Sequence, residues 1–388
     1  MGEVSDAGEG SVDYLAPFET FQAYSLRRGM VYRGRIRTEF AGDRARLARI
    51  LDTAPGTYQI EQMDGRVYAT LRIYHDGPPK QRLWLHITLL ALTVITTLGA
   101  GAELAKDNPR PLALVPFEFA LESLTATFIG EGSRVVADLW PDFVDEMETG
   151  VPYAAALLFI LLAHEMGHYL TARKYGVDAT LPFLIPAPFF FGTLGAIIKM
   201  RSPIVHRRSL FDIGVAGPIA GLVASVIVCV IGLSLSSYQS VNLAPAGSIA
   251  LGASPLFGAL VRGMLGPGGE MLVVQLHPVA VAGWFGLFIT FLNLMPLGQL
   301  DGGHVWYALM GKKQRYVGLV AFALLVVMGL RFPGWLVLAI LVLVLLRIGH
   351  PPVMDESVRL GWGRKVVGLA VIVVFVLLFI AEPIVVPH

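Results

Sequence analysis

The sequence predicts an all-α membrane protein that crosses the bilayer several times, with a small α+β module at its N-terminus. Of its 388 residues, 55% are hydrophobic and only 15% are charged, whereas a soluble domain usually carries about 25% charged residues. Several apolar stretches are long enough to cross a bilayer as helices. The formal net charge is +1, so no excess of positive charge points to a nucleic-acid partner, and none is expected.

The polar part of the chain comes first. Residues 1–18 are acidic and lack the apolar run of a signal peptide, so we expect a disordered leader. Residues 19–80 are expected to form a small soluble α+β module, because segments that alternate like strands flank one with helical spacing. The turn signal Asp64-Gly65 predicts a hairpin and a βαββ order. The membrane domain is placed at residues 81–388.

Seven apolar segments are expected to cross the membrane. The fourth contains Pro296 and several glycines, so a broken helix is predicted there. Lysine and arginine gather at alternate ends of the segments, which predicts a cytoplasmic N-terminus by the positive-inside rule. The same rule places the C-terminal end of the second segment toward the cytoplasm, and a bacterial inner membrane is the expected location. The segments are residues 83–101, 151–172, 212–235, 280–308, 316–331, 333–349 and 364–382.

The apolar stretch between the second and third segments is not expected to be a helix. It contains Pro182, Pro186, Pro188, Gly192 and Gly195, and proline and glycine at this density break helices. Non-helical backbone at membrane depth is tolerated only where protein or a wet cavity shields it. A re-entrant hairpin beside the active site is therefore predicted.

The second segment contains "HEMGH", which places His164 and His168 on one face of a helix. Two histidines at this spacing can bind one zinc ion, and the intervening Glu165 can act as the general base toward a water molecule. A chance match, with histidines that only pack, is the alternative interpretation. Ionisable residues are costly inside an apolar span and usually mark function there, which favours the metal site.

A third metal ligand is expected from "FLNLMPLGQLDGGHVW", where the fourth segment breaks. Asp301 is the candidate, because an unpaired carboxylate beside the membrane would be costly and a metal ion would satisfy it. His304 is the second choice as a ligand and could instead support the site from outside. A third interpretation is that Asp301 only caps the following helix.

The pair "HEMGH" and "NLMPLGQLDGGH" resembles the site-2 protease family of zinc intramembrane metalloproteases. The resemblance covers roughly residues 150–310, the expected catalytic core. "GTLGAIIKM" and the N-terminal module are similar to the branch that includes the plastid homologues. The family implies His164, His168 and Asp301 as ligands of one zinc ion, and Glu165 as the base. It also implies that Asn293 contacts the substrate backbone or the oxyanion.

The resemblance implies hydrolysis of peptide bonds within or near transmembrane segments of membrane-anchored regulatory proteins, such as anti-sigma factors or tethered transcription factors. Segment 237–279 is shorter than a PDZ domain and the stretch after residue 382 is shorter than a CBS pair, so we do not expect regulation by these modules of several relatives. A zinc- or proton-coupled transporter is the alternative function, and a scaffold with a structural zinc ion is a third.

The "GTLGAIIKM" stretch is predicted to hold an extended substrate by strand addition. Its residues Gly195, Ala196, Ile197 and Ile198 would offer main-chain hydrogen bonds to the substrate. The alternative is that these side chains only face lipid or the core. In the third segment, small residues at helical spacing, among them Gly217 and Gly221, predict close helix packing beside the site.

Overall fold

The computed structural model describes residues 13–26, 29–63, 65–74, 81–106, 147–187, 191–240, 250–269, 272–346, 348–351, 353–356 and 358–385. The chain consists of two compact units, Met1–Gln81 and Arg82–His388. Residues 75–80, before the first apolar segment, and residues 107–146, between the first and second, lie outside the described residues.

The N-terminal unit is a four-stranded antiparallel sheet with two helices. The strand order is β1-β2-β4-β3. Leu47 and Leu51 of one helix are fully buried against Ala69 and Leu71 of the sheet. Its elements are β1 (Phe18–Leu26), β2 (Gly29–Ile36), α1 (Thr38–Ala41), α2 (Arg44–Leu51), β3 (Gly56–Met63) and β4 (Arg66–Tyr74).

The predicted βαββ order is wrong, because β1 precedes it as an additional strand. Residues 19–23 of β1 are exposed at the sheet edge. Because neither face of this stretch is buried, its sequence need not alternate between apolar and polar residues, which is the signal that identifies a strand. The β3–β4 hairpin lies where it was predicted, with Met63 opposite Arg66 and Gly65 at a φ of 76°. Asp64 lies outside the described residues.

The expected boundary of the leader at residue 18 is also wrong. Phe18 is buried at the start of β1, and Tyr14 and Leu15 pack against the same core. Ordered structure therefore begins before residue 18 because these apolar side chains cover the end of the sheet. Residues 1–12 of the predicted leader lie outside the described residues.

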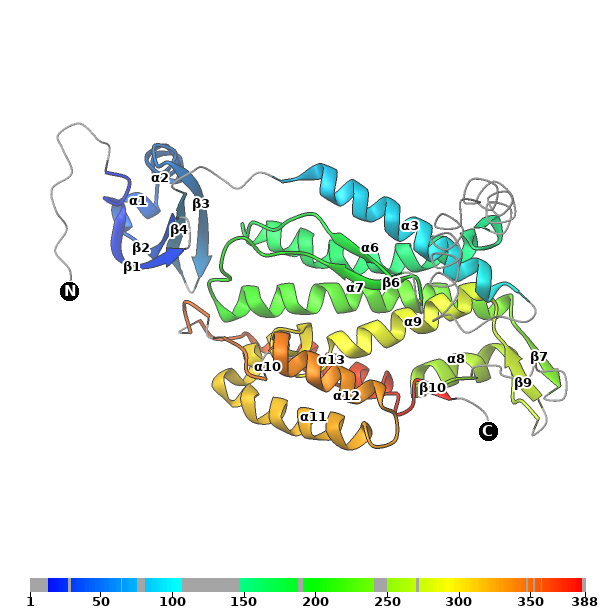
Figure 1. The fold of residues 1–388 in the computed structure, drawn as a ribbon. Coiled ribbons are helices and arrows are strands. Elements are labelled where there is room, and N and C mark those ends of the chain that lie inside the picture. The colour runs from blue at the N-terminus through cyan, green and yellow to red at the C-terminus, as the bar shows by residue number, and fades with distance from the viewer. Residues whose placement is uncertain are drawn as a thin grey trace. The chain divides into compact units, whose positions relative to one another are not determined.

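The second unit is mainly helical, and helices occupy all seven predicted apolar segments (Figure 1). Within the described part of the chain, three helices are long and apolar enough to cross a membrane by length and composition: α3 (Leu83–Leu104), α6 (Val151–Lys174) and α7 (Arg207–Ser234). The remaining helices of these segments are α9 (Pro278–Asn293), α10 (Asp301–Met310), α11 (Gln314–Met328), α12 (Gly334–Leu341) and α13 (Trp362–Leu377). A 3₁₀ turn (Gly311–Lys313) joins α10 to α11, and a π-helical run (Val342–Leu346) follows α12.

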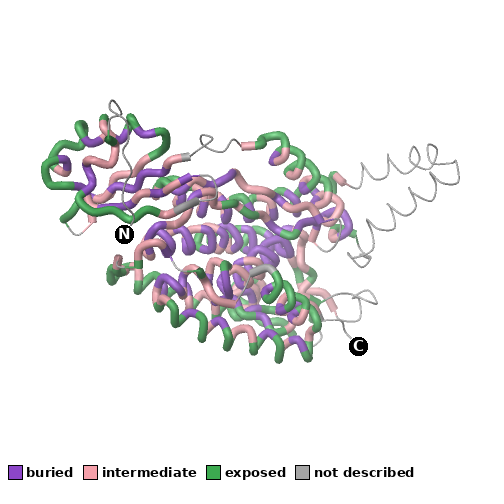
Figure 2. The backbone as a smooth tube through the Cα atoms, turned by 60° about the vertical axis from the view of Figure 1, so that its left-hand side comes forward, coloured by how far each residue is buried: buried purple, intermediate pink, exposed green. Residues whose placement is uncertain are grey.

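The core of this unit lies where α6, α7 and α9 pack together, and buried backbone concentrates there (Figure 2). Glycines allow the close approach. A Cβ at Gly167 of α6 would lie 2.5 Å from the carbonyl oxygen of Ala216 of α7, and one at Gly283 of α9 would lie 2.7 Å from Sγ of Cys229.

At the end of α6, the Tyr175 hydroxyl and the Arg364 guanidinium both donate to the Asp212 carboxylate. Burial and the hydrogen bond to Asp212 raise the pKa of Tyr175 to about 12.

The stretch predicted to be a hairpin forms one. β5 (Phe183–Pro186) and β6 (Thr193–Ile197) pair antiparallel, with Phe183 opposite Ile197 and Leu184 opposite Ala196. Residues 188–190 of the connection lie outside the described residues. Two helices hold the tip of the hairpin. Thr96 of α3 donates to the carbonyl oxygen of Gly192 at 2.6 Å, and Tyr153 of α6 donates to that of Phe191 at 3.0 Å.

The fourth segment is broken as predicted. α9 ends at Asn293 and α10 begins at Asp301, and Gly298 in the turn between them has a φ of 51°. The peripheral elements are the short helix α8 (Pro255–Leu265), the paired strands β7 (Ser237–Ser240) and β9 (Leu272–Gln275), and the paired strands β8 (Ala250–Leu251) and β10 (Ile384–Val385).

Candidate metal centre

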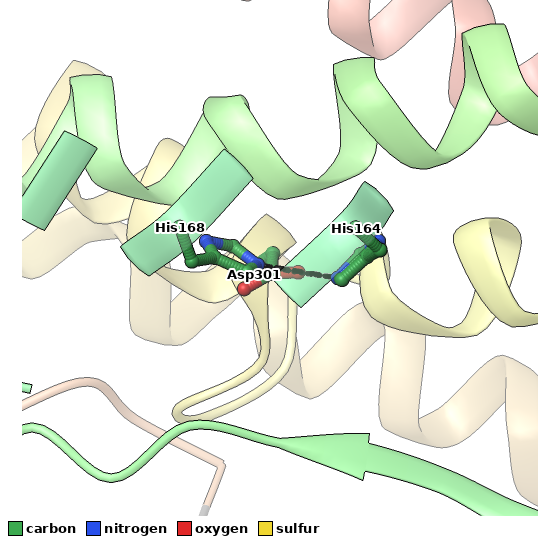
Figure 3. Close-up of side chains that lie close together, drawn as sticks. All are labelled: His164, His168 and Asp301. Atoms are coloured by element: carbon green, nitrogen blue, oxygen red, sulfur yellow. Dashed lines mark hydrogen bonds and ion pairs between the residues drawn. The ribbon is translucent and has the colours of Figure 1, made fainter. Parts of the chain in front are cut away.

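Three of the predicted site residues meet at the centre of the helical unit. His164 and His168 lie one turn apart on α6, and their rings point toward the Asp301 carboxylate (Figure 3). Only 4% of His164 and 6% of His168 is exposed. The spacing places both imidazoles on one face of the helix, and the break before α10 brings Asp301 to that face.

The distances fit a tetrahedral metal ion. Nε2 of His164 lies 3.2 Å from Nε2 of His168, and these two nitrogens lie 3.3 Å and 3.1 Å from Oδ2 of Asp301. Ligand atoms about 2.0–2.1 Å from a tetrahedral zinc ion are separated by roughly 3.3 Å. The three atoms therefore have the spacing that such an ion requires. No other group of three such side chains with this convergence occurs among the described residues.

The hydrogen bond on the far side of His168 supports the same conclusion. Nδ1 of His168 lies 2.8 Å from the carbonyl oxygen of Ile213. A carbonyl oxygen can only accept, so Nδ1 carries a proton, and in the neutral ring Nε2 then presents a lone pair. That lone pair faces a carboxylate oxygen and a second imidazole nitrogen. Electron-pair donors at this separation need a cation between them, and a divalent metal ion meets this need.

Asp301 does not cap its helix. The N-cap residue of α10 is Leu300, and Asp301 is the first helical residue, with its side chain directed to the histidines. Two glycines behind it let the turn fold tightly. A Cβ at Gly302 would lie 2.0 Å from the carbonyl oxygen of Leu294, and one at Gly303 would lie 2.3 Å from that of Gly298.

The small residues of α7 make the space for the imidazoles. A Cβ at Gly217 would lie 2.0 Å from Nε2 of His168, and a Cβ at Gly221 would lie 2.8 Å from Nδ1 of His164. The sequence predicted close helix packing at these glycines. It did not show that the groups they accommodate are the two histidine rings themselves.

Glu165 lies beside the centre without joining it. It is 6% exposed and is not one of the three converging residues. The backbone amide of Ile198, which directly follows β6, lies near its carboxylate. The end of the hairpin is thus close to the predicted base, an arrangement that the sequence motif alone did not indicate.

Asn293 also reaches the centre. Its Nδ2 lies 3.2 Å from Nε2 of His164, so the last residue of α9 places an amide at the edge of the triad. His304, the second choice as a ligand, does not join the converging group. His304 lies one turn along α10 from Asp301, and its Nδ1 is 2.7 Å from Nε2 of His350.

The remaining predicted residues, Gly195, Ala196 and Ile197, lie on β6. Sequence reasoning did not identify the Ile213 carbonyl or the contacts of His350, because main-chain partners and loop contacts leave no motif in the sequence. The spacing of glycines along α7 was the one available signal for the room around the rings.

Fold and site define a helical, apolar chain with a buried His-His-Asp centre, the arrangement of a membrane-embedded metalloprotein. Residues 152–330 match the model of peptidase family M50. The match confirms the predicted resemblance to site-2 proteases, and the chain is an integral membrane protein.

Among the curated relatives are plant proteins whose names describe them as chloroplastic. The chain is 32% identical over 322 residues to "Probable zinc metalloprotease EGY1, chloroplastic" of Arabidopsis thaliana, covering 79% of this chain and 55% of the relative. It is 28% identical over 389 residues to "Probable zinc metalloprotease EGY3, chloroplastic" of Oryza sativa subsp. japonica, covering 93% of this chain and 62% of that protein. The chain thus spans little more than half the length of these relatives. No solved structure matches.

The packing of Gly217 against His168 leads to a testable prediction. Gly217→Ala should weaken metal binding at least tenfold, because a methyl group 2.0 Å from Nε2 must displace the ring. Metal affinity would be measured by titrating the purified apoprotein with Zn²⁺ against a competing chelator.

Gly99→Ala is the matched control. A Cβ at this helical glycine of α3 meets no atom within 4 Å, and alanine favours a helix over glycine by about 0.5–1 kcal/mol. Its metal affinity should equal that of the wild type. Equal affinity in the Gly217→Ala variant would contradict this account of the centre.

Proposed function

We propose that the protein is a zinc-dependent intramembrane endopeptidase that hydrolyses peptide bonds within or near transmembrane segments. The observation that carries this proposal is the convergence of His164, His168 and Asp301, with Glu165 adjacent, inside an apolar helical core. The match of residues 152–330 to peptidase family M50 and the printed names of the plastid relatives support it.

Each residue has a defined task in this proposal. His164, His168 and Asp301 hold the zinc ion, which when bound supplies a Lewis acid that polarises the scissile carbonyl. Glu165 takes a proton from the attacking water and transfers it to the leaving amine. The Ile213 carbonyl fixes the tautomer and orientation of the His168 ring. Asn293, at the edge of the triad, donates to the carbonyl oxygen as negative charge develops there.

Strand addition to β6 accounts for how a substrate is held. A helix hides its carbonyl groups in its own hydrogen bonds, so a transmembrane substrate must unwind before hydrolysis. β5 occupies one edge of β6, and Leu194 and Ile197 on β6 are 63% and 55% exposed. Main-chain hydrogen bonds along the other edge of Gly195–Ile198 would hold an extended segment with little regard to its sequence. Because the amide of Ile198 lies near Glu165, a strand on that edge would lead to the base.

Seven membrane crossings with a cytoplasmic N-terminus are part of the proposal. The seven helical segments and their alternating basic ends support this topology. It makes the β5–β6 hairpin a re-entrant element and places the active site toward the cytoplasmic side. A bacterial inner membrane stays a prediction, since the printed names of the relatives describe chloroplast proteins.

The substrates in this proposal are membrane-anchored proteins with a transmembrane helix, and the bilayer is the reaction medium. Regulatory proteins such as anti-sigma factors or tethered transcription factors fit this class. The rival function is a zinc- or proton-coupled transporter. Such a protein needs a polar pathway to both membrane faces, whereas the described metal-ligating side chains concentrate at one centre.

Glu165→Gln separates a peptidase from a transporter. The variant should bind one zinc ion per chain like the wild type, because Glu165 is not a ligand, and it should cleave a transmembrane substrate at least a hundredfold more slowly. Zinc content and cleavage of a reconstituted single-span substrate would be measured on the same preparations.

His168→Ala is the companion variant and should lose both zinc and cleavage. Undiminished cleavage by Glu165→Gln would exclude Glu165 as the base. Wild-type protein that moves Zn²⁺ across vesicle membranes and never cleaves would establish the transporter instead.

Ile198→Pro tests the role of the hairpin. Proline removes the amide near Glu165 and interrupts main-chain bonding at the end of the β6 edge. Cleavage should fall at least tenfold while zinc content stays at one ion per chain. A loss of strand docking would raise KM, whereas a misplaced base would lower kcat, so steady-state kinetics distinguish the two causes.

Leu194→Ala is the matched control, because it removes an exposed side chain of β6 and leaves every main-chain donor in place. It should retain most of the wild-type activity. Normal cleavage by Ile198→Pro, at normal expression, would argue against strand docking.

A further inference from the structure

A short irregular stretch after α12 contacts the turn that carries Asp301. We call residues 348–351 and 353–356 the strap. The strap lies outside residues 152–330, the region that matches peptidase family M50. It contains His350 and ends in two acidic residues, Asp355 and Glu356.

The strap and α11 together bind the backbone of the Asp301 turn. The carbonyl oxygen of Ile348 accepts from the amide of Gly298 at 3.0 Å. Gln314, at the start of α11, donates from Nε2 to the carbonyl oxygen of Pro296 at 2.9 Å. Its Oε1 accepts from the backbone amide of His350 at 3.0 Å. Gln314 is 1% exposed, so one buried amide side chain joins the turn to the strap.

Further contacts tie the strap to the helices on both sides of the centre. Nε2 of His350 lies 2.7 Å from Nδ1 of His304 on α10, and Glu356 accepts from the Tyr307 hydroxyl at 2.9 Å. The amide of Asp355 donates to the carbonyl oxygen of Val205, just before α7, at 2.8 Å. The strap is thus held at both ends by elements that surround the triad.

These contacts satisfy backbone groups that the break between α9 and α10 leaves without helical partners. Between α9 and α10 the backbone has no helical ladder, and buried carbonyl and amide groups need partners. Pro296 offers no amide, and Gly298 has a positive φ. External partners therefore add to the few backbone hydrogen bonds that the turn makes within itself. A metal ligand, in contrast, must be held within about 0.5 Å of its productive position.

We propose that Gln314 and His350, acting through the strap, are positioning residues that fix Asp301 for metal binding. The inference rests on the metal centre of the proposed function. It assigns the strap a task in the active site although the strap lies beyond the M50 region. Neither residue touches the converging ligand atoms, so both act only through the turn and α10.

Gln314→Met is the direct test, because it keeps the length of the side chain and removes its three hydrogen bonds to Pro296, Ile348 and His350. Zn²⁺ affinity of the purified full chain should fall about 10- to 100-fold, the range seen when outer-shell partners are lost. The absorption spectrum of the Co²⁺-loaded variant should change, since Asp301 would coordinate differently. A role confined to folding would leave that spectrum unchanged in the folded fraction.

Ser225→Ala is the matched control. It removes a buried hydroxyl of α7 that bonds within its own helix, to the carbonyl oxygen of Gly221 at 2.7 Å, and should leave the affinity and spectrum unchanged. His350→Phe is the second variant should Gln314→Met not fold. It keeps an aromatic ring against Tyr307 and removes the contact with His304, so its Zn²⁺ affinity should also fall.

The outcomes are distinguishable. Wild-type affinity and spectrum in the folded variant, Gln314→Met or its substitute, would overturn the positioning role and leave the proposed function intact. Zn²⁺ binding that persists after the side chains of His164 and Asp301 are removed would overturn the metal centre itself. Weaker binding in the variants, with an unchanged Ser225→Ala control, would support the inference.

Discussion

The structure depends on one arrangement, in which three electron-pair donors point at one another inside an apolar helical core. Lone pairs of two imidazoles and a carboxylate, about 3.1–3.3 Å apart, are unfavourable neighbours unless a cation lies between them. The close approach of α7 makes this possible, because Gly217 and Gly221 leave no side chain where the rings lie. The same face of α6 therefore both binds the metal ion and packs against α7.

The bilayer sets the second constraint, because irregular backbone at membrane depth must find partners within the protein. Two non-helical stretches border the centre, the β5–β6 hairpin and the turn before Asp301. Side chains from outside each stretch meet this need. Thr96 and Tyr153 bind the carbonyl groups at the hairpin tip, and Gln314 binds that of Pro296. The same hydrogen bonds that satisfy the backbone of these stretches also give them defined positions beside the triad.

The match to peptidase family M50 and the contacts around the site divide the chain in an informative way. All three converging residues, Glu165 and the hairpin lie within residues 152–330. The strap lies beyond them, yet it contacts the Asp301 turn and α10. The part of the chain that supplies the chemical groups is thus held in place by a part with no motif of its own.

By itself, the sequence determined the apolar segments, the broken fourth helix and the pair of motifs at His164 and Asp301, because periodicity, proline and ligand spacing are local properties. Only the tertiary structure decided that Asp301 faces the histidines, that His304 pairs with His350, and that Ile198 lies near Glu165. Edge strand β1 escaped prediction, since its exposed residues lack an alternating burial pattern. Contacts between residues more than a hundred positions apart, such as His168 and Asp301, arise from helix packing, which no local pattern encodes.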